Sequence, residues 1–428
     1  MKFSFCFLPI ILIMFAGCRM AERVEQIDQE KSKIENNTVS QQDDPESKLF
    51  IAECESIEQK TIVDTIKEFS GKTAGQKQKD ITNELDQKID FTRGLYLTAY
   101  KTASADFYTI LDYADSAKIN TIVFDLKNMH GEVFFKTTQN QLLRGDNYKP
   151  ILNIAEVVKT LHARNMKAVT RMVMFHDMIN ASRDSTLRPT LPSGEVWTES
   201  KKRGPSWLDP SHPTVQKYLL DLIEEVAKSG VDEIQFDYIR FPTQGYADKA
   251  IFYFQKADEL MLEQDSTYVC RTKADIITGF LRRAKKICDK YKVTLTADVF
   301  AIVAWQRNVD IAMTGQDMPM MTRYLDAIHP MIYSSHFDDT FGFRENVPNE
   351  PFYIMYKGTK LTQQNTNSPC LVIPYIQANS WKVNYKKEYI ISQIRAIEEL
   401  NADGYILWNS SNLYKRTLIW LKEYYASN

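Results

Sequence analysis

Residues 231–242 read Val-Asp-Glu-Ile-Gln-Phe-Asp-Tyr-Ile-Arg-Phe-Pro and place charge inside an apolar strand. The stretch follows Gly230 and ends at Pro242, which does not fit the middle of a sheet. A parallel strand covered on both faces is nearly all apolar, so an ionised Asp237 within it is costly unless it is paired or used. In barrels of alternating strands and helices, chemistry is carried by polar groups at the carboxyl ends of strands. We therefore interpret Asp237 as a candidate active-site carboxylate, with a structural pairing to Arg240 or to a neighbouring strand as the alternative.

The bulk composition is that of an ordinary globular protein and argues against a nucleic-acid partner. The 428 residues include 53 basic and 55 acidic side chains, a net charge of −2, and 44% are hydrophobic. Nucleic-acid binding needs a clustered basic face, and a neutral or weakly charged substrate fits this balance better. The length suits one large domain with an extension, or two domains.

The first 18 residues have the pattern of an export signal. Lys2 precedes an apolar run over 3–15, and small residues stand directly before Cys18. The run is too short to span a bilayer comfortably and has the form of a secretory signal peptide. Ala-Gly-Cys at 16–18 resembles the lipobox of bacterial lipoproteins, which implies cleavage before Cys18 and its lipidation. We expect an extracytoplasmic lipoprotein of the cell envelope, anchored to a membrane on its periplasmic or cell-surface side, with plain secretion as the alternative.

The segment 19–90 separates this signal from the main domain. Residues 19–48 are rich in Glu, Gln, Asp, Asn, Lys and Ser, a composition that cannot bury a core, so they predict a polar tether. Residues 49–90 carry apolar residues at loosely helical spacing, which is compatible with a short helical element or with partial disorder.

Strand-like and helix-like segments alternate over 91–428. Apolar strand-like runs occur at 94–100, 121–128, 167–175, 233–241, 294–301, 327–334, 371–377 and 404–409. Helix-period segments lie at 105–118, 151–165, 214–229, 272–290, 386–400 and 413–425, and short helices are expected within 302–326 and 338–370. Eight strands alternating with helices predict an α/β fold, a (β/α)8 TIM barrel. A doubly wound sheet usually shows a glycine-rich turn after its first strand, which residues 98–102 lack.

Two carboxylates at neighbouring strand ends predict the chemistry. Asp237 ends the fourth predicted strand, and Asp298 lies on the fifth. Glycoside hydrolysis uses such a pair, one as general acid and the other as nucleophile or base. Closeness would separate their pKa values, so that one carboxyl stays protonated near neutral pH. We predict Asp237 as the nucleophile or base and Asp298 as the general acid.

Further polar and aromatic residues near strand ends are predicted to bind substrate or to tune the two carboxylates. They are Asp125, Arg171, Trp207, Arg240, His329, Tyr333, His336, Gln377, Trp408 and Asn409. Trp207, in the long loop 176–212, and Trp408 are predicted sugar platforms, because sugar rings stack their C–H faces on aromatic rings. The alternative for each tryptophan is that it packs the loops together.

The cysteines do not indicate a metal site. Cys54, Cys270, Cys288 and Cys370 show no Cys-x-x-Cys spacing. Cys270 and Cys288 are the nearest pair for a disulfide in an oxidising compartment, or are buried thiols, and the sequence leaves this open. We expect a monomer that needs neither metal nor cofactor.

Four motifs stand in order along the barrel segment. They are Trp-Leu-Asp-Pro (207–210), the opening stretch (231–242), His-Pro-Met-Ile-Tyr-Ser-Ser-His-Phe (329–337) and Gly-Tyr-Ile-Leu-Trp-Asn-Ser-Ser-Asn (404–412). Together they resemble the bacterial "putative glycosyl hydrolase domain" family over residues 92–425. The resemblance implies a (β/α)8 barrel and carbohydrate hydrolysis, without an established catalytic pair.

The chain is also distantly similar to the chitinases of glycoside hydrolase family eighteen, which carry Asp-x-x-Asp-x-Asp-x-Glu on the fourth strand. Asp232 and Asp237 occupy comparable places, but the chitinase acid aligns with Ile239 and the middle aspartate with Gln235. This departure argues against a chitinase-type, substrate-assisted mechanism, and it is why Asp298 is our candidate acid.

The sequence therefore predicts a glycosidase that acts on a polysaccharide or glycan outside the cytoplasm. Two alternatives remain open. One is a non-catalytic carbohydrate-binding lipoprotein. The other is a metal-dependent hydrolase, such as a deacetylase, with Asp125, Asp237 and His329 as ligands, although no local spacing supports it.

Overall fold

The computed structural model describes residues 91–138, 142–200, 202 and 204–427. The predictions for the signal peptide, for Cys18 and for the tether up to residue 90 lie outside these residues. None of the helices in the described part is both long and apolar enough to cross a membrane.

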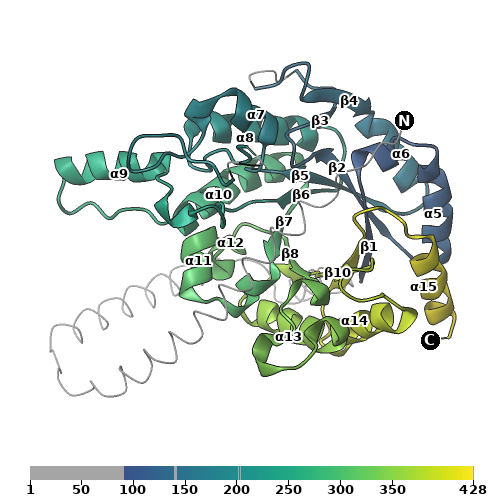
Figure 1. Cartoon of the computed structure of the whole chain (residues 1–428). Coiled ribbons are helices and arrows are strands. Elements are labelled where there is room, and N and C mark those ends of the chain that lie inside the picture. Colours follow the sequence, from purple (N-terminus) through teal and green to yellow (C-terminus); the bar gives the residue numbers. More distant parts are fainter. Residues whose placement is uncertain (1–90, 139–141, 201, 203, 428) are drawn as a thin grey trace, which may run out of the picture. The chain divides into compact units, whose positions relative to one another are not determined.

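Eight parallel strand positions form a closed barrel, which confirms the predicted (β/α)8 TIM barrel (Figure 1). Its strands are β1 (Thr92–Leu97), β2 (Thr121–Lys127), β5 (Lys167–Val173), β6 (Glu233–Asp237), β7 (Thr294–Phe300), β8 (Ala327–Ile332), β10 (Tyr375–Gln377) and β11 (Gly404–Trp408). The short strand β9 (Leu371–Val372) pairs with β8 just before β10, so the seventh position consists of two pieces. The barrel is closed because β1 pairs with both β2 and β11.

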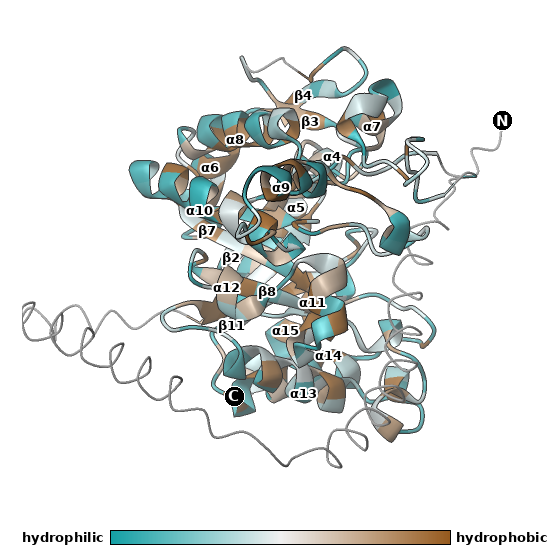
Figure 2. Ribbon diagram, turned by 90° about the vertical axis from the view of Figure 1, so that its left-hand side faces the viewer, coloured by the Kyte–Doolittle hydropathy of each residue, from teal (hydrophilic) through white to brown (hydrophobic). Residues whose placement is uncertain are grey.

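Helices surround the barrel and bury one apolar face each against it. They are α5 (Asp106–Ser116), α6 (Ile154–His162), α8 (Pro213–Ala227), α10 (Lys273–Tyr291), α13 (Pro351–Gln364), α14 (Lys387–Glu399) and α15 (Lys415–Ser427). The residues at the helix N-termini are typical of helix starts. Pro213 occupies the first turn of α8, and Thr272 forms a capping box with Asp275 at the start of α10. Figure 2 shows hydrophilic and hydrophobic residues along the same helices, as expected for elements with one buried face.

A close backbone contact marks the seam between the first and last strands. Gly404 has a φ of +145°, and a Cβ at this position would lie 2.2 Å from the carbonyl oxygen of Thr92. Only glycine allows β11 to approach β1 so closely. Beyond the strands, the side chain of Asn412 accepts a hydrogen bond from the backbone N–H of Thr98 at 2.8 Å.

Several elements were not expected from the sequence. β3 (Val133–Phe135) and β4 (Tyr148–Leu152) extend the sheet beyond β2, and α4 (Ala99–Thr102) and α7 (Met178–Arg183) are short helices in loops. The segment between β6 and α10 contains α9 (Tyr253–Gln264), which extends away from the barrel in Figure 1. Short helices were expected within 302–326 and 338–370: α11 (Asn308–Thr314) and α12 (Met318–Met321) lie in the first range, and the longer α13 lies in the second.

Candidate active site

The barrel interior is polar near the carboxyl ends of the strands. Asp125 on β2, Arg171 on β5 and Gln235 on β6 are direct neighbours across the sheet, and Asp298 on β7 pairs with His329 on β8. Because side chains alternate between faces along a strand, these register positions bring the polar side chains into one enclosed layer. The four predicted carboxylate and guanidinium positions, Asp125, Arg171, Asp237 and Asp298, therefore come together.

Arg171 is the centre of this layer. Its Nη1 donates to Oδ1 of Asp125 at 2.6 Å, and its Nη2 donates to Oδ2 of Asp237. Its Nε lies 3.8 Å from Oδ2 of Asp298. All three aspartates are buried, with 2–6% of their surfaces exposed. One guanidinium thus contacts three carboxyl groups from three different strands, and such planar, charge-assisted pairing is the strongest kind that Arg forms.

Burial and neighbouring charge separate the protonation states of these groups. Burial and the Asp237 carboxylate together raise the pKa of Asp298 to about 8, against the opposing effects of His329 and Arg171. Burial also raises the pKa of Asp125, which Arg171 counteracts. Although burial alone would lower the pKa of Arg171, the carboxylates of Asp125 and Asp237 raise it well above its usual value. At neutral pH the layer therefore holds a protonated acid, Asp298, beside a permanent cation.

Both oxygens of Asp237 accept hydrogen bonds. Oδ2 accepts from Arg171, and Oδ1 accepts from the backbone N–H of Tyr238 at 2.6 Å. Tyr238 adopts a left-handed conformation with a φ of +51°, so the chain turns sharply directly after Asp237. The end of β6 and this turn together fix the direction of the carboxylate.

Gln235 and Tyr375 complete the contacts of Asp298. The side-chain amide of Gln235 donates from Nε2 to Oδ1 of Asp298 and to the hydroxyl oxygen of Tyr375, the latter at 2.9 Å. Both residues are almost fully buried. The acid is therefore held from β6 and β10 as well as from β5.

A second polar group lies toward the amino-terminal ends of the strands. Nε2 of His329 is 3.5 Å from Oε1 of Glu233, which also accepts a hydrogen bond from Thr296 at 2.7 Å. Nδ1 of His329 is 2.9 Å from the carbonyl oxygen of Ile373. Burial lowers the pKa of His329, but the pairing with Glu233 outweighs it and leaves the pKa raised. His329 thus connects Asp298, its register partner on β7, with Glu233 near the start of β6.

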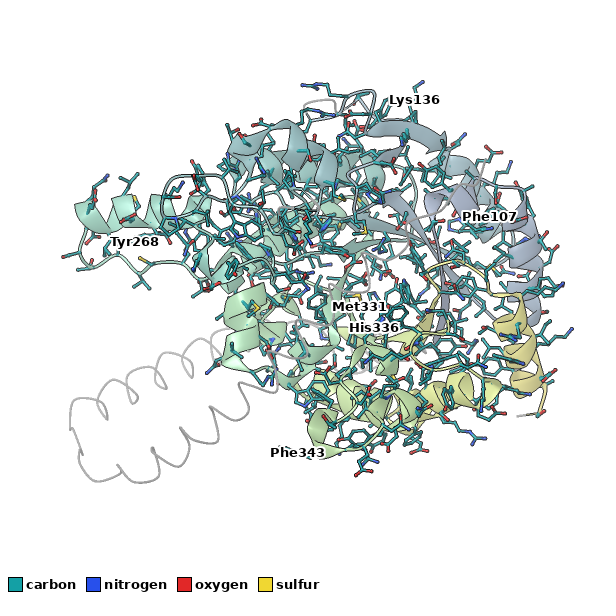
Figure 3. The ribbon with its side chains drawn as sticks, in the orientation of Figure 1. Phe107, Lys136, Tyr268, Met331, His336 and Phe343 are labelled. Atoms are coloured by element: carbon teal, nitrogen blue, oxygen red, sulfur yellow. The ribbon has the colours of Figure 1, made fainter. Side chains whose placement is uncertain are left out.

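Two aromatic rings cover one side of the layer. Tyr333 and Trp408 stack with ring centroids 4.8 Å apart at 23°, and Trp408 remains partly exposed. The ring of His336 contacts Tyr333 edge-on at 5.2 Å, and burial lowers the pKa of His336 to about 4. Figure 3 labels Met331 on β8 and His336 in the turn that follows this strand. The predicted platform Trp408 and the predicted residues Tyr333 and His336 therefore form one aromatic wall.

Trp207 and Arg240 lie in a separate, buried cluster. Trp207 is 1% exposed, and the guanidinium of Arg240 lies 4.6 Å from its ring centroid and 4.0 Å from that of Phe300. The indole N–H of Trp207 donates to Glu199 at 3.3 Å. A ring enclosed in this way presents no free face to a sugar, so its position favours the alternative in which Trp207 packs the loop. Arg240 does not pair with Asp237.

Gln377 and Asn409 connect loops and do not contact the carboxylates. The amide of Gln377 donates to Ser335 and to the carbonyl oxygen of Asn379, both at 3.0 Å. The amide of Asn409 donates to the carbonyl oxygen of Ala378 at 3.0 Å. Their substrate-binding role stays a prediction.

The arrangement does not resemble a metal centre. Within the described part of the chain, no three or more His, Cys, Asp or Glu side chains are grouped so that they could hold a metal ion. Asp125 and Asp237 both face Arg171, and His329 faces Glu233 and a carbonyl oxygen. Cys270, Cys288 and Cys370 are free thiols, so the structure does not form the disulfide that the sequence left open.

Two residues of the site were not predicted from the sequence. Tyr96 donates from its hydroxyl to Oδ2 of Asp125 at 2.7 Å, and Glu233 pairs with His329. Signals for both are visible in the sequence: Tyr96 is a polar aromatic in an apolar strand, and Glu233 shares its face of β6 with Gln235 and Asp237.

Comparison with known proteins agrees with this fold. The model of the family described as "putative glycosyl hydrolase domain" matches residues 94–414. A solved hypothetical protein from Ruminiclostridium thermocellum ATCC 27405 is 29% identical with a TM-score of 0.40, and the match covers 48% of this chain and 97% of that protein. No curated protein matches the chain.

Two solved glycoside hydrolases have the same fold at low identity. The PgaB (BpsB) glycoside hydrolase domain from Bordetella bronchiseptica is 14% identical with a TM-score of 0.53, over 78% of this chain and 98% of that domain. Alpha-L-fucosidase isoenzyme 2 from Paenibacillus thiaminolyticus is 13% identical with a TM-score of 0.52, over 79% of this chain and 49% of that enzyme. At these identities the likeness shows the fold alone.

Proposed function

Because the chain belongs to the "putative glycosyl hydrolase domain" family and folds as a glycosidase-like TIM barrel, we propose that it hydrolyses glycosidic bonds in a polysaccharide or glycan. One observation carries the proposal: a buried carboxyl with a pKa raised to about 8, Asp298, shares Arg171 with the acceptor carboxylate Asp237. Two carboxyl groups in different protonation states are the arrangement that glycoside hydrolysis uses.

In the proposed reaction, Asp298 transfers its proton to the glycosidic oxygen as the bond between that oxygen and the anomeric carbon breaks. The bonding electron pair leaves with the oxygen. Asp237 acts on the anomeric carbon, either by bonding to it or by taking a proton from a water that bonds to it. Each turnover consumes one water. If Asp237 bonds to the carbon, Asp298 then takes a proton from a water that bonds to the anomeric carbon, and the bond to Asp237 breaks with its electron pair returning to the carboxylate. If Asp237 instead takes the proton of the water, proton exchange with solvent restores both carboxyl groups. Arg171 holds Asp237 in place and stays cationic throughout.

The aromatic wall of Tyr333 and Trp408 would place a sugar ring beside the carboxylates. Their stacked geometry and the partial exposure of Trp408 support this role. We also propose that the protein acts outside the cytoplasm as a lipoprotein anchored through Cys18, which the sequence pattern of residues 1–18 supports.

Replacement of either carboxylate tests the proposal. Reducing-end release from a panel of polysaccharides would be measured with the full chain, recovered from the membrane fraction where its anchor should keep it. Asp237→Asn and Asp298→Asn should each lower turnover by about 10³-fold, the scale of general acid–base catalysis, and should leave binding of the same glycan nearly unchanged.

Asp258→Asn is the matched control. Asp258 is also a buried, ion-paired aspartate, but it lies on α9 and pairs with Arg271, so this variant should keep full turnover. Wild-type activity in Asp237→Asn or Asp298→Asn would contradict the proposal. Glycan binding without release of reducing ends from any polymer would favour the non-catalytic alternative, and loss of activity on chelation would favour the metal-dependent one.

A further inference from the structure

Gln235 is an uncharged side chain enclosed among ionisable ones. It is fully buried on β6, between Arg171 and Thr296 in the register of neighbouring strands. Its Nε2 donates both N–H groups, one to Oδ1 of Asp298 and one to the hydroxyl oxygen of Tyr375. Its Oε1 is buried without a hydrogen-bond partner in the described part of the chain. A buried unpaired acceptor is costly, so the two hydrogen bonds of the amide offset a cost at this position.

The contact with Gln235 decides which oxygen of Asp298 carries the proton. The carbonyl oxygen of a protonated carboxyl is a better acceptor than its hydroxyl oxygen, so the N–H donated to Oδ1 favours the tautomer in which the proton lies on Oδ2. Nε of Arg171 lies 3.8 Å from Oδ2. A guanidinium has donors and no acceptor, so Arg171 cannot take up the O–H of Asp298. Arg171 therefore leaves a proton on Oδ2 available to an incoming acceptor.

Tyr375 fixes the orientation of the amide. Burial raises the pKa of Tyr375 well above its usual value, so its oxygen remains part of a neutral phenol that can accept from Gln235. A reversed amide would leave two buried N–H groups without acceptors in place of a single carbonyl oxygen, which costs more. The observed orientation, with Nε2 facing Asp298, is thus the stable one.

We propose that Gln235 is a positioning residue: it confines the proton of the candidate acid Asp298 to Oδ2, ready for the leaving-group oxygen. This inference rests on the proposed function for its catalytic consequence, but the proton placement itself is a property of the free protein. The groups that face Asp298 are Asp237 and Gln235 on β6, Arg171 on β5, His329 and Tyr333 on and after β8, and Tyr375 on β10.

The direction of the effect follows from these neighbours. A donor to a carboxylate stabilises its charged form, and Gln235 accordingly lowers the pKa of Asp298. Gln235→Met keeps the length of the side chain and removes both N–H groups. This variant should raise the pKa of Asp298 further and should release the proton from its fixed oxygen.

The test combines titration with kinetics. The Asp298 carboxyl would be titrated by NMR in protein labelled with ¹³C at the aspartate carboxyl carbons, with Asp298→Asn used to assign its signal. Gln235→Met should shift the midpoint upward and lower kcat by about tenfold or more with little change in KM, because the lost interaction acts on the transition state. The alkaline limb of the pH profile should move upward together with the NMR midpoint.

Thr296→Val is the control for a merely structural effect. Thr296 is a buried register neighbour of Gln235 whose hydroxyl donates to Glu233, not to Asp298, so its loss should lower stability without moving the Asp298 titration. Tyr375→Phe removes only the hydroxyl that orients the amide and should produce a smaller upward shift. This variant stands in for Gln235→Met if the latter does not fold.

An Asp298 midpoint that is unchanged in Gln235→Met, or in Tyr375→Phe where only that variant folds, overturns the inference. If the wild type hydrolyses no glycan and the midpoint still shifts, the proposed function fails while the proton placement holds. If the wild type is active and the midpoint does not shift, only the role of Gln235 fails.

Discussion

The two faces of the barrel sheet differ sharply in chemistry. The outer face and the covering helices form a continuous apolar layer, in which residues such as Leu219 on α8 and Phe280 on α10 are fully buried. Inside the barrel, a small separate apolar cluster around Val169 and Ile406 lies beside Arg171 and its aspartates. Each apolar side chain buried outside stabilises the fold by about 1.5–3 kcal/mol. The outer layer therefore supplies the stability that allows costly charges inside.

Arg171 and Arg164 show the same contrast at the level of one side chain. Both bridge aspartates, but Arg171 does so in the barrel interior, whereas Arg164 pairs at the surface with Asp112 and Asp115, whose side chains are 68% and 41% exposed. Exposed pairs are screened by water and contribute little. Inside the barrel, loss of the cation leaves carboxyl groups buried together.

The largest effect is expected from Arg171→Met. Removing one partner of a buried charge network costs about 3–5 kcal/mol, and the variant should also lose turnover. Without the guanidinium, Asp125 and Asp298 bind protons more readily in the folded state, so the loss should be largest at pH 8 and smaller at pH 5. Urea unfolding at both pH values measures this difference.

Arg164→Met is the surface counterpart and should cost less than about 1 kcal/mol at either pH. If both variants lost the same free energy of unfolding, the ion pairs of Arg171 would contribute no more to stability than exposed ones do.

A somewhat smaller and pH-independent loss is expected from Leu219→Ala in the outer layer. Truncating a fully buried leucine removes apolar contacts and leaves a cavity, at a cost of about 3 kcal/mol. No titrating group is involved, so urea unfolding should give the same loss at pH 5 and pH 8, with turnover preserved. If the stability lost in Leu219→Ala varied with pH, the apolar layer outside the barrel would be coupled to the charged groups inside it.

The last prediction concerns the slope of stability with pH rather than a loss of stability at one pH. The pKa of Asp298 is about 8 in the folded protein and about 3.9 in an unfolded chain, so between these values only the folded state holds the proton. Its contribution is complete below pH 4 and is lost as pH rises toward 8, by about 1.4 kcal/mol per pH unit. Asp298→Asn should lack this decline over pH 5–8 in urea unfolding.

Asp258→Asn serves as the reference for that slope. The Arg271 ion pair outweighs burial and lowers the pKa of Asp258, so this carboxyl does not titrate within pH 5–8. If Asp298→Asn followed the wild-type slope, Asp298 would not be the protonated acid.

Much of the fold could be predicted because barrel strands buried on both faces appear as continuous apolar runs. The alternation of side chains also placed Asp237 and Asp298 on the inner face. The contact of one guanidinium with three strands could not be predicted, since it depends on barrel closure. The burial of Trp207 depends on the path of a long loop, and α9 was missed because only Phe254 and Asp258 are buried along it.

The seam at Gly404 has a consequence for how the chain acquires its structure. Thr98 and Asn412, which meet across this seam, are 314 positions apart in the chain. The first strand cannot complete its pairing until the last strand has left the ribosome, and long-range pairing of this kind slows folding. A chain that ended before β11 would leave β1 and β10 with unpaired edges, which are prone to aggregation. Maturation of the barrel therefore comes after synthesis of the whole chain rather than during it.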